Sequence, residues 1–249
     1  MALATGTCVN ILYLDSSTEA CTAGVAINDR IIADFAIAPR GHAQRLLPMA
    51  EEMLARAGIG YPDLDLVAFG RGPGSFTGVR IATAMAQGIA MARDLPMMGM
   101  SSLECLAWGA WRRFKDGTGP LGGPVEHSGS GPMDGLDVLV AIDARMGEIY
   151  RAGYRIIDGQ LTVIEPESVG PPGLPRRRDR LVPVVAVGSG FARYPELLDD
   201  GLACSHDSQA LPQADDALDF LSRTGRQQWL APDQAIPHYL RNQVATVAT

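Results

Sequence analysis

A glycine-rich stretch with the sequence GRGPGSFTGVR fills positions 70–80, directly after the apolar run at 66–69. A turn of this kind between a strand and a helix can direct backbone N–H groups at an anion, with Gly72, Gly74 and Ser75 as the candidate contacts. The same residues could serve the backbone alone, because glycine readily adopts positive φ and Ser75 can cap the following helix. The residues by themselves do not separate anion binding from this structural role.

Three known site motifs do not fit this stretch. A Walker A loop needs Lys and then Ser or Thr after its last glycine, whereas Gly78 is followed by Val79 and Arg80. The Rossmann fingerprint needs glycine at its sixth position, which is Ser75 when counted from Gly70. The G-x-S-x-G spacing of a nucleophile elbow is also missing. The stretch therefore predicts neither a P-loop, nor a dinucleotide site, nor an activated serine.

Two aspartates are further candidates, because each follows an apolar run. Asp15 comes after ILYL and Asp143 after VLVAI. Carboxylates at such positions can act as a general base or hold Mg²⁺ beside a nucleotide. They can also cap the ends of strands, which is the interpretation we favour. As a nucleotide or anion site, the sequence thus offers Asp15 and Asp143 together with the glycine turn.

The two aspartates lie in segments that repeat one pattern. Residues 11–33 and 138–163 both indicate a strand, an acidic turn, a strand, a tight turn and a strand. Each segment is followed by another strand, a glycine turn and a helical pattern, at 66–93 and from 184 onward. This duplication predicts an α/β fold with two lobes, each with a mixed sheet flanked by helices.

Periodicity and composition place the remaining segments. Apolar residues at helical spacing predict helices at about 43–57 and 77–93, followed by a third helix. The stretch 115–135 is rich in Gly and Pro and too long for a packed connection, so we interpret it as a mobile linker. A histidine within it, His127, is interpreted as a solvated loop residue. The basic run within 170–180 is interpreted as a solvated loop, with contact to RNA as the alternative.

These segments define the expected domain organisation. We expect a first lobe at 1–108, a flexible linker at 109–136 and a second lobe at 137–249. The segment after Asp215 is expected to pack back across the first lobe.

Composition narrows the function classes. An apolar share of 47% with 20% charged residues is typical of folded, soluble proteins. The formal net charge of -7 gives no general attraction to nucleic acid. No run of 18 apolar residues occurs, so we expect a cytoplasmic protein without a membrane span. The four cysteines are scattered and form no CxxC pair, so no zinc site is predicted.

Six short segments together resemble one protein family. In chain order they are LYLDSSTEA, RGHAQRLLP, GRGPGSFTGVR, GMSSLECLA, VAIDARMGEIY and PHYLRNQVA. They span most of the chain, and GPGSFTGVR together with AIDARMGE is highly specific, so the chain is identified as similar to the TsaB (YeaZ) family. The resemblance implies a duplicated actin-like (ASKHA, ribonuclease H-like) fold, in agreement with the repeat.

The resemblance also implies a function and partners. TsaB proteins are subunits of the bacterial machinery that makes N6-threonylcarbamoyladenosine next to the anticodon of tRNA. The chain is then expected to be a non-catalytic scaffold or dimerisation subunit that binds a TsaD-like catalytic subunit. A TsaE-like ATPase is expected in the larger complex, and a homodimer when the chain is alone. Contact with tRNA is expected to be indirect, and contact with a membrane is not expected.

Residues that catalytic relatives use are replaced here. TsaD holds a metal through two histidines four residues apart, and Ser102 and Leu106 stand in the comparable places. Actin-like kinases hold phosphates with D-x-G turns, where this chain has Ser17 and Arg145. His42 has no histidine four residues on and is interpreted as structural. The resemblance thus implies no intrinsic cofactor or metal, with ATP or ADP and metal expected on the partner subunits.

An actin-like enzyme is the competing hypothesis, either a small-molecule kinase or a metallopeptidase-like protein. Hydrolysis of ATP or cleavage of a peptide by the isolated chain would favour it.

The helix predicted at 77–93 lacks a polar face, since only Arg80, Gln87 and Arg93 are clearly polar. Such a helix is expected to be buried on both sides. We predict that it docks, together with the helix at 43–57, against the equivalent pair of a second subunit, because small residues let helices approach closely. The alternative is a helix sandwiched inside one lobe. The predicted interface residues are Leu46, Met49, Ala50, Met53, Ala82, Met85, Ala86, Ile89 and Ala90.

Overall fold

The computed structural model describes residues 9–121, 135–173, 182–198 and 203–241. The chain forms two compact units. The first unit consists of Met1–Ser102 and Pro212–Pro237, and the second consists of Leu103–Leu211 and His238–Thr249. The chain therefore passes from one unit to the other three times.

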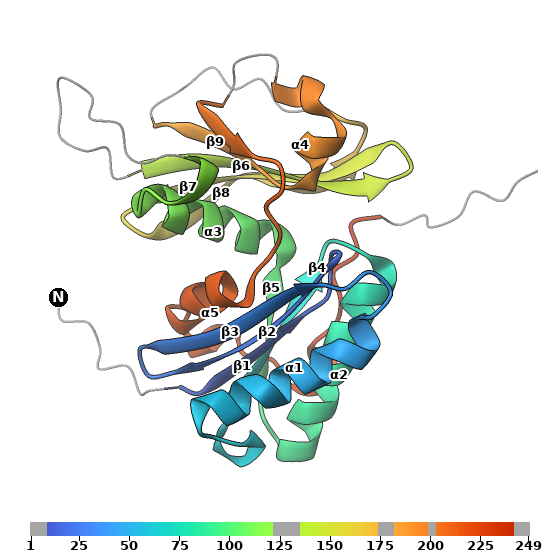
Figure 1. The fold of residues 1–249 in the computed structure, drawn as a ribbon, viewed down its shortest axis with the longest axis vertical. Helices are drawn as coiled ribbons and strands as arrows, with labels where there is room; N and C mark the ends of the chain where they lie inside the picture. Colours follow the sequence, from blue (N-terminus) through green and yellow to red (C-terminus); the bar gives the residue numbers. More distant parts are fainter. Residues whose placement is uncertain (1–8, 122–134, 174–181, 199–202, 242–249) are drawn as a thin grey trace, which may run out of the picture. The chain divides into compact units, whose positions relative to one another are not determined.

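The first unit is built on a five-stranded sheet with the order β3-β2-β1-β4-β5. A meander of antiparallel strands begins it, and two parallel strands extend it beyond β1 (Figure 1). The strands are β1 (Ile11–Asp15), β2 (Ala20–Ile27), β3 (Arg30–Ile37), β4 (Leu66–Gly72) and β5 (Met97–Ser101).

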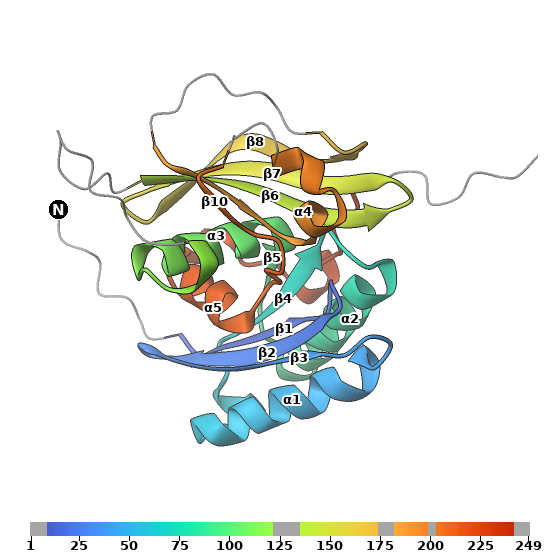
Figure 2. The same ribbon diagram turned by 45° about the horizontal axis from the view of Figure 1, so that its top comes forward.

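Helices cover both faces of this sheet. On one face lie α1 (His42–Ala57) and α2 (Phe76–Arg93), and on the other lies α5 (Ala214–Ser222) (Figure 2). Helix α1 ends at Gly58, whose φ of 75° suits glycine. Helix α2 begins at Ser75, whose hydroxyl accepts a hydrogen bond from the backbone of Gly78. Both predicted helices are therefore present, with their expected ends.

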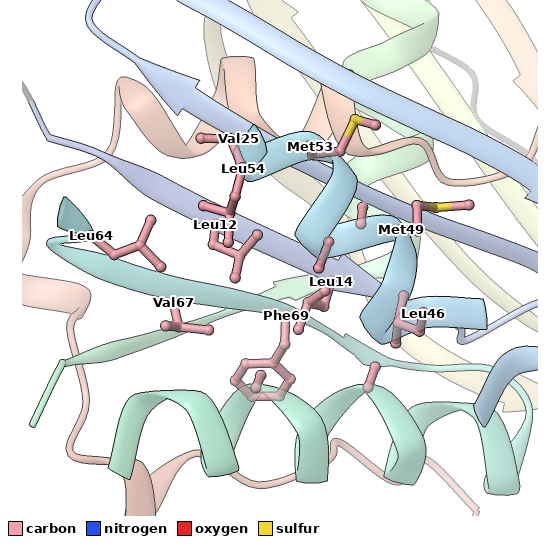
Figure 3. Packing of buried hydrophobic residues seen from close by; sticks show 14 of the residues in the cluster. Leu12, Leu14, Val25, Leu46, Met49, Met53, Leu54, Leu64, Val67 and Phe69 are labelled. Atoms are coloured by element: carbon pink, nitrogen blue, oxygen red, sulfur yellow. The ribbon is translucent and has the colours of Figure 1, made fainter. Parts of the chain in front are cut away.

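The core of the first unit lies between the sheet and the pair α1 and α2 (Figure 3). Alternate residues of β1 and β4 point into it, because side chains on a strand alternate between faces. Burial of each large apolar side chain contributes about 1.5–3 kcal/mol. The central members are Leu12, Leu14, Val67 and Phe69 of the strands and Leu46, Met49, Met53 and Leu54 of α1.

The second unit repeats this plan. Its sheet has the order β10-β9-β6-β7-β8, which matches the first sheet strand for strand when read from the other end. The strands are β6 (Gly135–Arg145), β7 (Glu148–Ile157), β8 (Gln160–Gly170), β9 (Val184–Val187) and β10 (Ser205–Asp207). Pairing is again antiparallel through the first three and parallel from β6 to β9 and β10. The predicted duplicated α/β fold is confirmed.

The second copy differs from the first in its helices. Helix α3 (Ser102–Lys115) covers one face of the second sheet, and α4 (Ser189–Arg193), only five residues long, stands where α2 stands in the first unit. Between β8 and β9, the residues that the structure describes include no helix comparable to α1. Short 3-10 helices occur at Tyr61–Asp63, Gly119–Leu121, Pro195–Leu198, Arg226–Gln228 and Pro232–Gln234.

The domain boundaries differ from those expected. The first unit ends at Ser102 rather than at 108, and residues 109–115 complete α3 rather than beginning a linker. The physical reason is burial: Trp108, Trp111 and Phe114 recur at helical spacing and are 2%, 8% and 3% exposed. The part of the expected linker that holds His127 lies outside the described residues, as does most of the basic run within 170–180.

The segment after Leu211 belongs to the first unit as far as Pro237. Helix α5 contacts β2 and β3, and Leu218 lies so close to Gly24 that a side chain there would collide with it. No helix within the described ranges is both long and apolar enough to cross a lipid bilayer.

Candidate functional site

The glycine turn packs directly against the turn that follows β1. A side chain at Gly74 would collide with the carbonyl of Ser17, and one at Gly78 would collide with the carbonyl of Ser16. The hydroxyl of Ser16 also donates to the carbonyl of Gly78 at 2.8 Å. The glycines are therefore required because two backbone segments approach closely here.

The backbone donors at the start of α2 are used within the first unit. The N–H of Ser75 donates to the carbonyl of Ser17 at 2.6 Å. The N–H of Gly78 donates to the hydroxyl of Ser75 at 3.3 Å, and that of Val79 donates to the carbonyl of Ser75 at 2.9 Å. The turn after β1 thus occupies the position in which an anion would accept these bonds.

Asp15 lies at the end of β1 and is 1% exposed. Its Oδ1 accepts a hydrogen bond from the N–H of Ser17 at 2.6 Å, and its Oδ2 accepts one from the hydroxyl of Tyr13 at 2.9 Å. A side chain at Gly70 would collide with this carboxyl group. Burial raises the pKa of Asp15, and the hydrogen bonds from Ser17 and Tyr13 oppose this shift. Asp15 is therefore an enclosed acceptor rather than an accessible base.

Asp143 holds the equivalent place in the second unit, two residues before the end of β6. Its Oδ1 accepts a hydrogen bond from the N–H of Arg145 at 2.9 Å, two residues on, as Asp15 does from Ser17. Its own N–H donates to the hydroxyl of Ser189 at 3.2 Å. The two aspartates cap the same turn in the two copies, as the repeat predicts. Within the first unit, Asp15, Gly72, Gly74 and Ser75 come together, whereas Asp143 belongs to the second.

A layer of buried hydroxyl groups lies where β1 and β5 end, made of Ser16, Ser17 and Thr18 after β1 and of Ser101 and Ser102 at the end of β5. The hydroxyls of Ser17 and Ser102 lie 2.9 Å apart. Sequence reasoning missed this layer, because separate stretches of serine and threonine give no signal of their meeting.

The places compared with the metal ligands of TsaD are filled by other contacts. Ser102 bonds to Ser17, and Leu106 packs 3.5 Å from the site of a Cβ on Gly188 in the second unit. Nε2 of His42 is buried without a hydrogen-bond partner among the described residues. The described ranges hold no group of three His, Cys, Asp or Glu side chains suited to a metal ion.

The predicted interface residues do not form a free surface. Seven of the nine are at most 5% exposed, and Met85 and Ile89 are half-buried against the same core. The reason is that α1 and α2 lie side by side on one face of the sheet and direct these residues inward. For the seven buried residues, the alternative of helices packed within one lobe accounts for the burial, whereas for Met85 and Ile89 the predicted interface stays a prediction. The buried seven are Leu46, Met49, Ala50, Met53, Ala82, Ala86 and Ala90.

A different stripe of α2 faces outward. Ala84, Gly88 and Met91 are exposed, and a Cβ at Gly88 would meet nothing within 4 Å. At the start of the helix, the guanidinium of Arg80 lies 3.5 Å from the centre of the Phe76 ring, which is itself 44% exposed. Periodicity could not separate this stripe from the buried one, because both consist largely of small residues.

Comparison with known proteins places the chain in a family. A family model described as TsaD, tRNA N6-adenosine threonylcarbamoyltransferase, matches residues 35–122. The tRNA threonylcarbamoyladenosine biosynthesis protein TsaB of Escherichia coli is 38% identical over 246 residues, which cover 95% of this chain and 96% of that protein.

Two solved structures agree with this result. YeaZ from Pseudomonas aeruginosa is 34% identical, with a TM-score of 0.78 over 93% of this chain and 100% of that one. A Pseudomonas aeruginosa protein described as similar to peptidase YeaZ is also 34% identical, with a TM-score of 0.77 over 94% of this chain and 100% of that one. Sequence identity above 30% extends over nearly the whole length of this chain and of each of these relatives. The chain therefore belongs to the TsaB family.

Proposed function

We propose that this chain acts in the biosynthesis of N6-threonylcarbamoyladenosine in tRNA, as a non-catalytic subunit that binds a TsaD-like catalytic subunit. The role in this pathway is supported by the similarity to the Escherichia coli protein. The non-catalytic role is supported chiefly by one observation. The carbonyl of Ser17 packs against the glycine turn and accepts a hydrogen bond from the N–H of Ser75. A nucleotide-binding relative would need free backbone donors at this position to bind phosphate.

The acidic residues support the same proposal. Asp15 is enclosed by Tyr13, Ser17 and Gly70, so a substrate would have to displace several contacts to reach it. In the second unit, Arg145 follows Asp143 where a phosphate cradle would need a bare backbone. The proposal therefore assigns ATP or ADP and metal to the partner subunits.

The outward stripe of α2 is the surface that we assign to the partner. Ala84 and Gly88 are small and exposed, which lets a partner helix approach closely, and Met91 offers 66% of its surface beside them. The same surface would join two copies when the chain is alone. The TsaE-like ATPase would join the larger complex, and tRNA would be reached through these proteins, because a chain of net charge -7 lacks its own attraction to a polyanion.

A substitution at Gly88 tests this assignment. Gly88→Arg should fold at least as stably as the wild type, since Arg is about 1 kcal/mol more favourable than Gly inside a helix. Its bulk and charge should prevent close approach, so binding to the purified TsaD-like subunit of the same cell should fall at least about a hundredfold. Gly88→Ala is the matched control, which should gain helix stability and still bind. Unchanged affinity of Gly88→Arg in calorimetry would place the interface elsewhere.

Two further measurements test the function itself. Depletion of the chain in its own cell should remove threonylcarbamoyladenosine from digested tRNA, as followed by mass spectrometry. The isolated chain should hydrolyse neither ATP nor peptides. Hydrolysis that is lost on Asp143→Asn would favour the competing enzyme hypothesis instead.

A further inference from the structure

The turn between β6 and β7, residues 145–148, has an unusual composition for its backbone shape. Its two central residues, Met146 and Gly147, have φ of 56° and 77°, and Arg145 before them has φ of 63°. Two-residue hairpin turns with positive φ strongly favour Asn, Asp and Gly, because other side chains meet the backbone in this conformation. Two successive long side chains in this region are therefore locally strained.

Two other tight hairpins in the described residues have the usual composition for such turns. Asn28, with φ of 54°, follows β2, and Asp158 with Gly159, at 50° and 70°, follows β7. Both turns use residues that tolerate positive φ. The composition of the 145–148 turn is thus not a requirement of the fold.

Burial does not explain the two side chains either. Met146 is 74% exposed, the highest value for a large hydrophobic side chain in the described part of the chain. The side chain of Arg145 is 85% exposed, and its Nη1 lies 3.8 Å from Oδ2 of Asp143. A pair so exposed and so distant contributes little to stability. The free energy of folding therefore gives no reason for Met and Arg at these positions.

The turn is nevertheless held in place. Arg241, only 19% exposed, donates from Nη2 to the carbonyl of Ala144 at 3.2 Å and from Nη1 to Sδ of Met146 at 3.6 Å. The same guanidinium also pairs with the carboxylate of Glu148. These contacts fix the turn from both of its strands, and a fixed surface loses less entropy on binding.

We propose that the 145–148 turn is a preformed protein contact, in which Met146 enters an apolar pocket of a partner subunit and Arg145 pairs with a carboxylate at the rim of that pocket. The charges around the turn favour a protein over RNA. Asp143 and Glu148 balance Arg145 and Arg241, so the turn offers a polyanion no net charge, whereas a single carboxylate can bind Arg145 directly. An exposed thioether suits an adaptable apolar pocket.

The variant Met146→Asn separates partner binding from folding. It relieves the backbone strain, which should stabilise the fold, and it removes the apolar side chain that would contact the partner. Its folding equilibrium constant in urea should rise by up to about tenfold, since Asn followed by Gly is the preferred pair for this turn. Two dissociation constants are measured, one for the TsaD-like subunit and one for the TsaE-like ATPase in the presence of that subunit. At least one of them should rise at least about tenfold in Met146→Asn. Met146→Leu keeps both the strain and the apolar side chain and loses only the 3.6 Å contact from Arg241 to Sδ, so it should stay close to the wild type in both measurements.

The hairpin after β7 provides the matched control. Asp158→Met should lower stability by placing Met in a left-handed position, while leaving both dissociation constants unchanged. If Met146→Asn becomes more stable and binds both proteins as tightly as the wild type, the proposal is overturned.

The choice of the TsaD-like subunit and the TsaE-like ATPase rests on the proposed function. A failure of that function can be distinguished from a failure of the present proposal. If the wild type binds neither protein, the proposed function fails by itself, and photo-crosslinking from position 146 of the full chain in cells decides the present proposal. A product that maps to a protein segment containing Asp or Glu beside apolar residues, and that Arg145→Glu abolishes, supports it. A product with RNA, or no product with a protein, overturns it.

Discussion

Asp15 shows how a residue suited to catalysis can be committed to structure. Burial raises the pKa of its carboxyl group, although Ser17 and Tyr13 donate hydrogen bonds to it. The folded protein therefore holds this proton more tightly than the unfolded chain does. The resulting contribution to stability is complete below the usual pKa of 3.8 and is lost as the pH rises through the raised folded value.

Asn is accordingly expected to replace Asp15 without loss of stability at pH 7. Its carbonyl can still accept from Ser17, and its amide can donate to the hydroxyl oxygen of Tyr13. Asp15→Ala removes both acceptors and should cost about 1–3 kcal/mol of unfolding free energy. In urea titrations, the stability of Asp15→Asn relative to the wild type should increase from about pH 3.5 to pH 7. A difference that does not change with pH would contradict the assigned direction of the shift.

Among the elements, β6 and β7 are joined by a buried ion pair. Arg155 donates from Nε and Nη2 to the two carboxylate oxygens of Asp137 at 2.7 and 2.8 Å, and Asp137 is 2% exposed. Arg155→Ala should cost about 3 kcal/mol, because it removes a guanidinium that donates two hydrogen bonds to a buried carboxylate. The double variant Asp137→Val with Arg155→Met should lose much less. Equal losses in the single and double variants, measured by urea unfolding, would show that the pair itself contributes the stability.

Helices and strands were the features of the fold that could be predicted best from the sequence. Helices α1 and α2 and the repeated strand pattern could be predicted because their apolar residues follow simple periods. The expected linker was given too early a start, at residue 109, since a glycine-rich stretch follows closely, whereas Trp111 and Phe114 belong to α3. The buried stripe at Ala86 and the outward stripe at Gly88 could not be separated in the sequence, because both sides of α2 carry small residues and the packing of the folded unit decides which is covered.

The candidate site was less predictable than the elements. The sequence identified the glycine turn and both aspartates, but it left anion binding and close packing equally possible. The contact that decides between them joins Ser17 to Gly74, residues from separate turns with no pattern that links them. The same holds for Arg241, whose contact with the turn after β6 depends on the path of the chain near its end.

At the scale of the whole molecule, the segment Pro212–Pro237 is an integral part of the first unit. The N–H of Ala214 donates to the hydroxyl of Thr22 at 3.0 Å. The amide of Gln87 donates to the carbonyls of Pro232 and Ala235 at 2.9 and 3.0 Å. These bonds reach both faces of the first sheet, from α5 on one side to α2 on the other.

A chain that stops at Leu211 is therefore expected to be unstable, since one face of its first sheet would lose α5. Residues 212–249 supplied as a separate chain should restore a folded protein on co-expression. The yield of protein after gel filtration and the cooperativity of its thermal unfolding would measure this. Cooperative unfolding of the 1–211 fragment alone would show that the returning segment is dispensable.

The same path has a consequence for synthesis in the cell. Strands β1 to β5 of the first unit leave the ribosome before residues 103–211, yet the unit is completed by residues 212–237. Its sheet must wait, with one face uncovered, while the whole of 103–211 is translated, which takes about 5–20 s at roughly 5–20 residues per second. A sheet translated before the second unit is thus finished after it, and during that interval it depends on the ribosome and chaperones to keep its apolar face from other chains.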